Sequence, residues 1–136
     1  MKTKIDDLEP REAELVRIAT EVRERAYAPY SHFKVGAALR VNSGKIYTGV
    51  NIENASYGLT NCAERTAIFK AVSEGEREYT TLAVVTENGI SPCGACRQVM
   101  VEFAPDSVVL IADIRGNVER YEMADLLPRS FTPEQL

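Results

Sequence analysis

Three cysteines constrain the fold of this chain more than any other sequence feature. Cys93 and Cys96 form a Cys-x-x-Cys pair, and Cys62 lies well upstream of it. An odd number of cysteines is a poor disulfide framework, whereas three thiolates can bind one zinc ion. With no obvious fourth ligand, one coordination position would stay open, which is typical of catalytic rather than structural zinc sites. Any fold of this chain must therefore bring Cys62 close to the Cys-x-x-Cys pair.

His32 is the only histidine, and so the only imidazole that could serve as a fourth zinc ligand. It lies in an expected loop at 28–33, before the first cysteine and without the paired spacing of zinc-binding histidines. We therefore expect a loop histidine rather than a ligand. A Cys-x-x-Cys pair by itself also occurs as half of a structural zinc site or as a redox pair, so those interpretations stay open at this point.

Strands and helices alternate in the hydrophobic pattern, which predicts an α/β sheet covered by helices. Helices are expected over 12–25, 62–74 and 94–103, with one helical turn at 124–127. Strands are expected over 33–41, 46–50, 81–86, 107–112 and 118–121, the last at a sheet edge. The first two strands form a hairpin, and the next two are apolar enough for the buried parallel part of a mixed sheet. Gly36 marks a bulge or a close backbone approach.

The length of the chain and its overall charge limit the classes of protein to consider. A chain of 136 residues predicts one domain, spanning 1–136. The net charge of −4 argues against a nucleic-acid partner, because such proteins are usually basic. No apolar run approaches the ~18 residues of a membrane span, and the N-terminus turns acidic where a signal peptide needs apolar residues. We therefore expect a cytoplasmic protein that binds neither membrane nor nucleic acid.

Both cysteine groups fall at the expected start of a helix, Cys62 after Asn61 and Cys93 after Pro92. Free backbone N–H groups and the positive end of the helix dipole lower the pKa of a thiol there. Because metals bind the thiolate, this placement favours zinc. Adjacent parallel strands would deliver both helix starts to the same edge of the sheet.

Glu64 and Arg65 follow Cys62 closely in the same expected helix. Two positions after Cys62, Glu64 does not share its helix face but can approach the open zinc position from the side. A carboxylate there can take a proton from a zinc-bound water and pass it to a substrate nitrogen. We assign Arg65, one helical turn from Cys62, to offset the negative charge that three thiolates leave on one zinc ion.

Cys-Ala-Glu at 62–64 and Pro-Cys-Gly-Ala-Cys at 92–96 together are the cysteine form of the zinc deaminase signature. From about Arg25 to Leu127, the sequence resembles the small, homotetrameric cytidine deaminases. The matching segments are APYS (28–31), FKVGAA (33–38), NIENASY (51–57), NCAERTA (61–67) and SPCGACRQ (91–98). The resemblance implies a three-layer α/β/α fold with a five-stranded mixed sheet. It also implies hydrolytic deamination of cytidine and 2′-deoxycytidine to uridine and 2′-deoxyuridine, with release of ammonia, in pyrimidine salvage.

The same resemblance implies a role for each candidate site residue. One Zn²⁺ per subunit would be bound by Cys62, Cys93 and Cys96, with Glu64 as the proton shuttle. Within the subunit, Phe33 would contact the base, and Asn51 and Glu53 would bind the ribose 3′-hydroxyl. The Ala63 backbone and the Glu64 side chain would hold the polar edge of the pyrimidine. The Ser91 carbonyl would face the leaving amine. Neighbouring subunits of a homotetramer would add Ala55 and Tyr57 near the ribose and Phe131 over the base. The expected partners are a small nucleoside and further copies of the chain.

Other functions fit parts of this pattern. Blasticidin S deaminase, which acts on another aminopyrimidine nucleoside, resembles this family around the zinc, although the segment 51–54 favours a plain ribose. A nucleic-acid-editing deaminase suits the acidic composition less well. A non-catalytic zinc module that only binds nucleosides would give bound zinc without ammonia release, and would leave Glu64 unexplained. From the residues alone, Asn51 and Glu53 also suit an ordinary polar loop, and Phe33 suits core packing.

Overall fold

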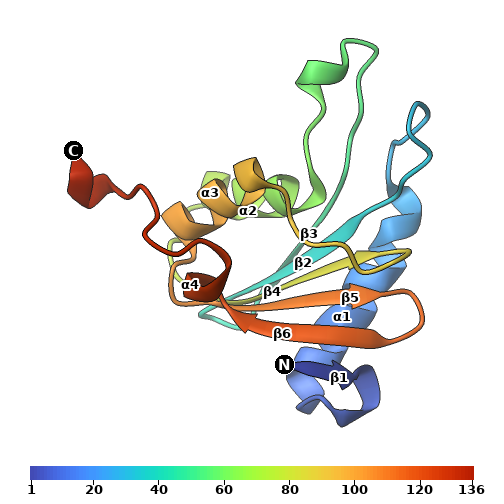
Figure 1. The fold of residues 1–136 in the computed structure, drawn as a ribbon, viewed down its shortest axis with the longest axis horizontal. Coiled ribbons are helices and arrows are strands. Elements are labelled where there is room, and N and C mark those ends of the chain that lie inside the picture. The colour runs from blue at the N-terminus through green and yellow to red at the C-terminus, as the bar shows by residue number, and fades with distance from the viewer.

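Six strands form one mixed sheet in a computed structural model that describes residues 1–136 (Figure 1). The strands are β1 (Lys2–Lys4), β2 (Gly36–Val41), β3 (Ile46–Val50), β4 (Tyr79–Thr86), β5 (Val108–Asp113) and β6 (Asn117–Glu122), in the order β1-β6-β5-β4-β2-β3. The helices are α1 (Pro10–Val22), α2 (Ala63–Ser73), α3 (Gly94–Phe103) and α4 (Met123–Leu126), with short 3₁₀ turns at Ile5–Asp7, Arg23–Arg25, Tyr57–Leu59 and Pro133–Gln135. Only β4 and β5 pair in parallel.

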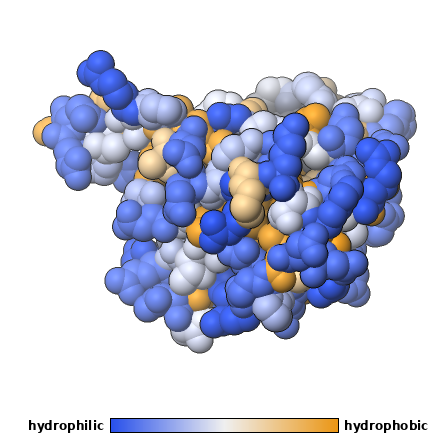
Figure 2. All heavy atoms as spheres, turned by 60° about the horizontal axis from the view of Figure 1, so that its bottom comes forward, coloured by the Kyte–Doolittle hydropathy of each residue, from blue (hydrophilic) through white to orange (hydrophobic).

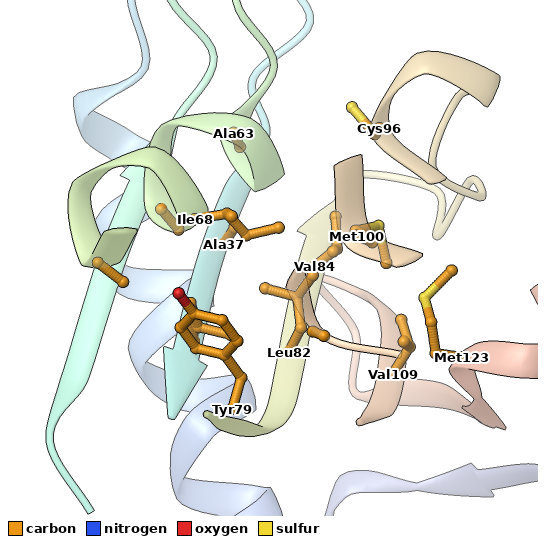
Figure 3. Close-up of a cluster of buried hydrophobic side chains, with 14 of the residues drawn as sticks. Ala37, Ala63, Ile68, Tyr79, Leu82, Val84, Cys96, Met100, Val109 and Met123 are labelled. Atoms are coloured by element: carbon orange, nitrogen blue, oxygen red, sulfur yellow. The ribbon is translucent and has the colours of Figure 1, made fainter. Parts of the chain in front are cut away.

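Helices cover both faces of the sheet, so the predicted α/β/α layering is confirmed. On one face, Leu15, Val16 and Ala19 of α1 pack with small and branched side chains of the central strands. On the other face, α2 and α3 lie side by side and bury the larger of the two apolar clusters, part of which Figure 3 shows. Burial of these aliphatic side chains, at roughly 25 cal/mol per Å² of apolar surface, stabilises the layers.

Two glycines let the helices approach the sheet closely on its opposite faces. A Cβ added at Gly36 would lie 2.1 Å from the Ala19 carbonyl of α1, and one added at Gly49 would lie 2.5 Å from the Ala63 carbonyl of α2. No side chain fits at either distance. The predicted close approach at Gly36 is therefore confirmed, while the irregularity of β2 lies between Arg40 and Val41.

The strand register explains how α2 and α3 begin at the same edge of the sheet. Gly36 pairs with Val50 near the end of β3 and with Val85 near the end of β4. The prediction of adjacent parallel strands was wrong in one respect, because β2 lies between β3 and β4. Since β2 is antiparallel to both, β3 and β4 still run in the same direction and end side by side with its start.

The expectation of five strands, with 118–121 at the edge, was wrong. Lys2–Lys4 pairs antiparallel with Asn117–Glu119 and forms the outer strand in place of β6. The sequence Lys-Thr-Lys offers no apolar alternation, so nothing in the hydrophobic pattern predicts a strand there. Lysines at a sheet edge also disfavour pairing with a second sheet.

Neither the helices nor the visible surface of the chain carries a long apolar stretch. None of the helices combines the length and the hydropathy that crossing a bilayer requires. The face seen in Figure 2 is mainly hydrophilic, with apolar side chains in small separate patches.

Candidate active site

The three cysteines, far apart in sequence, converge in the structure. Their Sγ atoms all lie within 4.8 Å of one another. Cys62 and Cys93 are the N-cap residues of α2 and α3, and Cys96 is buried in the first turn of α3. The convergence follows from the register described above, because β3 and β4 end at the same edge of the sheet, on either side of the start of β2, and each leads to one of these helices. His32 is not part of the cluster; it lies in the expected loop, with a positive φ of 60°.

The charges around Cys62 favour its thiolate. The pKa of Cys62 is lowered to about 5, first because the Cys96 thiol donates a hydrogen bond to it and then because of the Arg65 guanidinium. Arg65 Nη2 lies 3.1 Å from the Cys62 Sγ. The same hydrogen bond, together with burial, raises the pKa of Cys96. Three sulfur donors, with one already charged and with two helix N-termini beside them, fit a zinc ion with three thiolate ligands and an open fourth position.

Glu64 adds a buried carboxyl group directly beside this cluster. The residue is only 4% exposed and lies in the first turn of α2. Burial, reinforced by the nearby Cys62 charge, raises the pKa of Glu64 to about 7. A carboxyl group that titrates near neutral pH can both accept and donate a proton, which is what general acid–base chemistry requires.

A cavity of about 250 Å³ opens next to Glu64 and the cysteines. Its walls come from the loop before β2, the segment after β3 and the loop between β4 and α3. The lining residues are Ser31, Phe33, Val35, Asn51, Glu53, Tyr57, Thr60, Cys62, Glu64, Val84, Thr86, Ile90, Ser91, Pro92 and Cys93. A larger hollow of about 590 Å³ lies by β1 and β6, but it contains none of the cysteines. The chemistry of its walls, rather than its size, therefore marks the smaller cavity as the candidate site.

Asn51 and Glu53 are buried in the wall of this cavity and are both hydrogen-bonded to the loop before β2. Asn51 Oδ1 accepts from the Val35 N–H at 2.9 Å, and its Nδ2 donates to the Phe33 carbonyl at 2.7 Å. Glu53 Oε1 accepts from the Tyr30 and Ser31 N–H groups at 3.0 and 3.1 Å, and the Ser31 hydroxyl donates to Oε2. These bonds, led by that of the Ser31 hydroxyl, lower the pKa of Glu53. Both side chains therefore fix the part of the wall that carries Phe33.

The structure brings most of the predicted site residues to one place, but not all of them. Phe33, Asn51, Glu53, Tyr57 and Ser91 line the cavity together with Glu64, Cys62 and Cys93, whereas Ala63, Arg65 and Cys96 do not line it but lie in the first turns of α2 and α3. Ala55 is exposed and outside the lining. Phe131 is 57% exposed in the C-terminal segment, where its carbonyl accepts from the Gln98 side chain.

The sequence analysis gave no site role to seven of the lining residues. They are Ser31, Val35, Thr60, Val84, Thr86, Ile90 and Pro92. Val84 and Thr86 end an expected strand, and the carboxyl end of a buried strand is a common place for ligand contacts. Thr60 and Ile90 lie in loops, where no periodic pattern indicates which side chains turn inward.

The comparisons with known proteins agree with this geometry. Residues 10–112 match the family model "Cytidine and deoxycytidylate deaminase zinc-binding region". The chain is 52% identical to a cytidine deaminase of Halalkalibacterium halodurans over 125 residues, 90% of this chain and 95% of that protein. It is 34% identical to the blasticidin-S deaminase of Bacillus cereus, covering 93% and 96% of the two chains.

A solved structure gives the same result for the fold. The crystal structure of cytidine deaminase from Burkholderia pseudomallei matches with a TM-score of 0.85 at 53% identity, covering 87% of this chain and 97% of that one. The three-thiol cluster, the adjacent buried carboxyl group and these similarities point to one family. This chain belongs to the cytidine and deoxycytidylate deaminases that share a zinc-binding region.

Proposed function

We propose that this chain is a zinc-dependent hydrolase that converts cytidine and 2′-deoxycytidine to uridine and 2′-deoxyuridine with release of ammonia, a step of pyrimidine salvage. One observation carries the proposal: a buried carboxyl group with a pKa near 7, Glu64, lies beside three converging thiols at the wall of a cavity. Relatives at 52% and 53% identity that are named cytidine deaminases support the choice of substrate.

The protons of this reaction are assigned to Glu64. Zinc held by Cys62, Cys93 and Cys96 would supply Lewis-acid chemistry that lowers the pKa of water in the open position. Glu64 accepts one proton of the attacking water and delivers it to N3 of the base, and then carries the second proton, from the hydroxyl group now on C4, to the departing amine. The new C4–O bond and the broken C4–N bond consume one water and release one ammonia. Arg65 offsets the charge of the thiolates, as its 3.1 Å contact with Cys62 supports.

The remaining lining residues are assigned to the nucleoside. Asn51 and Glu53 offer a donor and an acceptor to the ribose 3′-hydroxyl, and their burial supports this role because water competes poorly there. Phe33 packs against the base, and the Ala63 backbone with the Glu64 side chain holds the polar edge of the pyrimidine. The Ser91 carbonyl faces the amine.

We also propose that residues 1–136 form a single domain that assembles into a homotetramer with shared active sites. Ala55, Tyr57 and Phe131 would then reach the site of a neighbouring subunit, Tyr57 in addition to lining the cavity of its own chain. Exposure supports this, since Tyr57 and Phe131 are each 57% exposed in one chain. A solution mass of four chains by light scattering is the expected result, and a monomer with full activity would contradict the shared site.

Deamination of blasticidin S is a second candidate, because a protein with that name is 34% identical over nearly the whole chain. The higher identity to cytidine deaminases makes it the weaker of the two. The deciding experiment incubates the zinc-loaded protein separately with cytidine, 2′-deoxycytidine and blasticidin S, and measures ammonia and the loss of cytosine absorbance. We expect rapid turnover of the first two. Turnover of blasticidin S alone, or bound zinc with no ammonia from any of them, would contradict the proposed function.

A further inference from the structure

Arg97, in the first turns of α3, makes three hydrogen bonds that no role assigned above explains. Its Nε donates to the Pro92 carbonyl at 2.9 Å, its Nη2 donates to the Ser91 hydroxyl, and its Nη1 donates to the Leu126 carbonyl at 2.8 Å. The first two acceptors precede the N-cap of α3, and the third ends α4. One planar guanidinium therefore joins the segment before α3 to a helix far downstream in the chain.

The segment that Arg97 holds is part of the cavity wall. Ser91 and Pro92 both line the cavity beside Cys93. The Ser91 carbonyl lies in the chain between the two acceptors that Arg97 binds, the Ser91 hydroxyl and the Pro92 carbonyl. It accepts no hydrogen bond from the backbone. Because groups on both sides of this peptide are fixed, the carbonyl keeps one direction while its oxygen stays free for a ligand.

We propose that Arg97 is a positioning residue for substrate selection: it fixes the Ser91 carbonyl as the acceptor for the 4-amino group of the nucleoside. The inference rests on the proposed deaminase function and adds the residue that sets the preference for amine over carbonyl. Cytidine has a donor at C4, whereas uridine has a carbonyl that only accepts. A fixed acceptor therefore favours the substrate and disfavours the product.

The shape of the guanidinium, rather than its charge, makes the three bonds possible. Arginine presents five N–H donors in a rigid plane, while lysine has a single nitrogen on a flexible stem. Arg97→Lys keeps the charge near α3 but cannot serve Ser91, Pro92 and Leu126 at once. Arg97→Lys is therefore expected to lower activity, whereas it would keep activity if Arg97 acted only through its charge.

Arg77 offers a matched control. It is exposed beyond the end of α2, and its Nη1 donates to the Val72 and Glu76 carbonyls at 2.9 Å each. Arg77→Gln thus removes the same kind of bond without touching the cavity. Arg97→Gln removes three hydrogen bonds of about 1 kcal/mol each and is expected to lower the melting temperature by up to about ten degrees, whereas Arg77→Gln, at an exposed side chain, should lower it by a few degrees at most.

The experiment compares zinc-loaded wild type, Arg97→Gln, Arg97→Lys and Arg77→Gln. It measures kcat/KM for cytidine, the inhibition constant of uridine, zinc per chain and the melting temperature. Both Arg97 variants are expected to lose about tenfold or more in kcat/KM, because misplacing a contact by about 1 Å is costly. Their uridine inhibition constants should stay within about threefold of wild type and their zinc content should not change. Arg77→Gln should match wild type.

If the wild-type protein deaminates cytidine, several results would overturn the role of Arg97 and leave the proposed function intact. They are wild-type kcat/KM in either Arg97 variant, equal weakening of cytidine and uridine, loss of zinc, or failure of both Arg97 variants to fold. The last two would make Arg97 a residue of the metal centre or of the fold. A wild-type protein that releases no ammonia from cytidine would instead overturn the proposed function, and the inference with it.

Discussion

The helices on the two faces of the sheet begin in different ways. The start of α1 is closed by its own chain, because the Glu9 side chain accepts from the Arg11 N–H at 2.9 Å and Pro10 has no N–H to satisfy. The starts of α2 and α3 are left open, since Cys62 and Cys93 make no capping hydrogen bond with their side chains. Neither cysteine side chain caps the first-turn N–H groups, and both helix starts lie where the three thiols converge.

The charged groups follow the same division. On the α1 face, Arg40 and Arg120 form ion pairs with Glu14 and Glu12, and α1 otherwise buries aliphatic side chains. On the other face, Glu64 is buried without a cation of its own, and its pKa is displaced to about 7. One face is built for stability, and the other leaves polar groups available for a metal and a substrate. Substitutions on the two faces should therefore affect different measurements.

The largest expected effect is on the open helix start of α3. Cys93→Ser replaces an exposed thiol that the cavity and the metal cluster share. A hydroxyl is a poor zinc ligand, so metal binding and turnover should both be lost, with a fall in kcat of about 10⁴ or more. Metal analysis and the ammonia assay measure the two losses. A variant that retained one zinc and wild-type turnover would contradict the three-thiol site.

Glu64→Gln should separate the chemistry from the metal. The amide has nearly the same shape but cannot carry a proton, so kcat should fall by about 10² to 10⁴ while zinc per chain stays unchanged. Glu102→Gln, on the exposed side of α3, is the matched control and should behave as wild type. Near-normal turnover in Glu64→Gln would remove the proton shuttle from the proposed mechanism.

Leu15→Ala tests the α1 face. Leu15 is fully buried between α1 and the sheet, so the substitution should lower the free energy of unfolding by about 2–5 kcal/mol. Activity per folded molecule should change little. The control is Leu136→Ala, at a leucine that is 91% exposed. A thermal melt measures stability and the ammonia assay measures activity. A large loss of kcat without loss of stability would contradict a purely structural role for the α1 face.

The lowered pKa of Glu53, on the cavity face, predicts how the stability of the fold depends on pH. Its pKa is lowered in the folded chain, chiefly by the Ser31 hydroxyl, from an ordinary value of 4.5. The unfolded chain therefore binds more protons, so the contribution of Glu53 is present above pH 4.5 and is lost as the pH falls through its folded pKa. Urea melts of wild type and Glu53→Gln should differ at neutral pH and converge in acid. A difference that grew in acid would have the wrong sign.

The smallest expected effect is at the closed start of α1. Glu9→Ala removes the cap and should lower stability by about 0.5–1 kcal/mol, or a few degrees in melting temperature, with kcat and zinc unchanged. A thermal melt detects the shift. An altered kcat would mean that the two faces are coupled.

Local patterns predicted the elements that position the metal site. Strand 46–50 and helix 94–103 were predicted with the observed bounds, because a turn and a proline respectively mark their starts. Helix 62–74 was one residue too long at each end, since Cys62 and Glu74 are caps. Because one zinc ion needs all three cysteines as ligands, the sequence predicted that the starts of two helices lie close together, whatever the order of the strands.

Long-range pairings were harder to predict. The edge strand Lys2–Lys4 forms through backbone bonds to β6, and the placement of β2 between β3 and β4 depends on cross-strand packing that a linear pattern does not contain. The network of Arg97 was missed for the same reason, because Leu126 lies far downstream in the chain. Phe131 was assigned from the family resemblance, and a single chain leaves it exposed.

X-ray absorption at the zinc edge of the purified wild-type protein tests the central claim most directly. We expect one zinc per chain with three sulfur neighbours at about 2.3 Å and one light atom from solvent. Cys96→Ser should reduce the sulfur count. A metal-free protein that still deaminates cytidine, or a zinc ion whose fourth neighbour is a protein side chain, would contradict the open position on which the proposed chemistry depends.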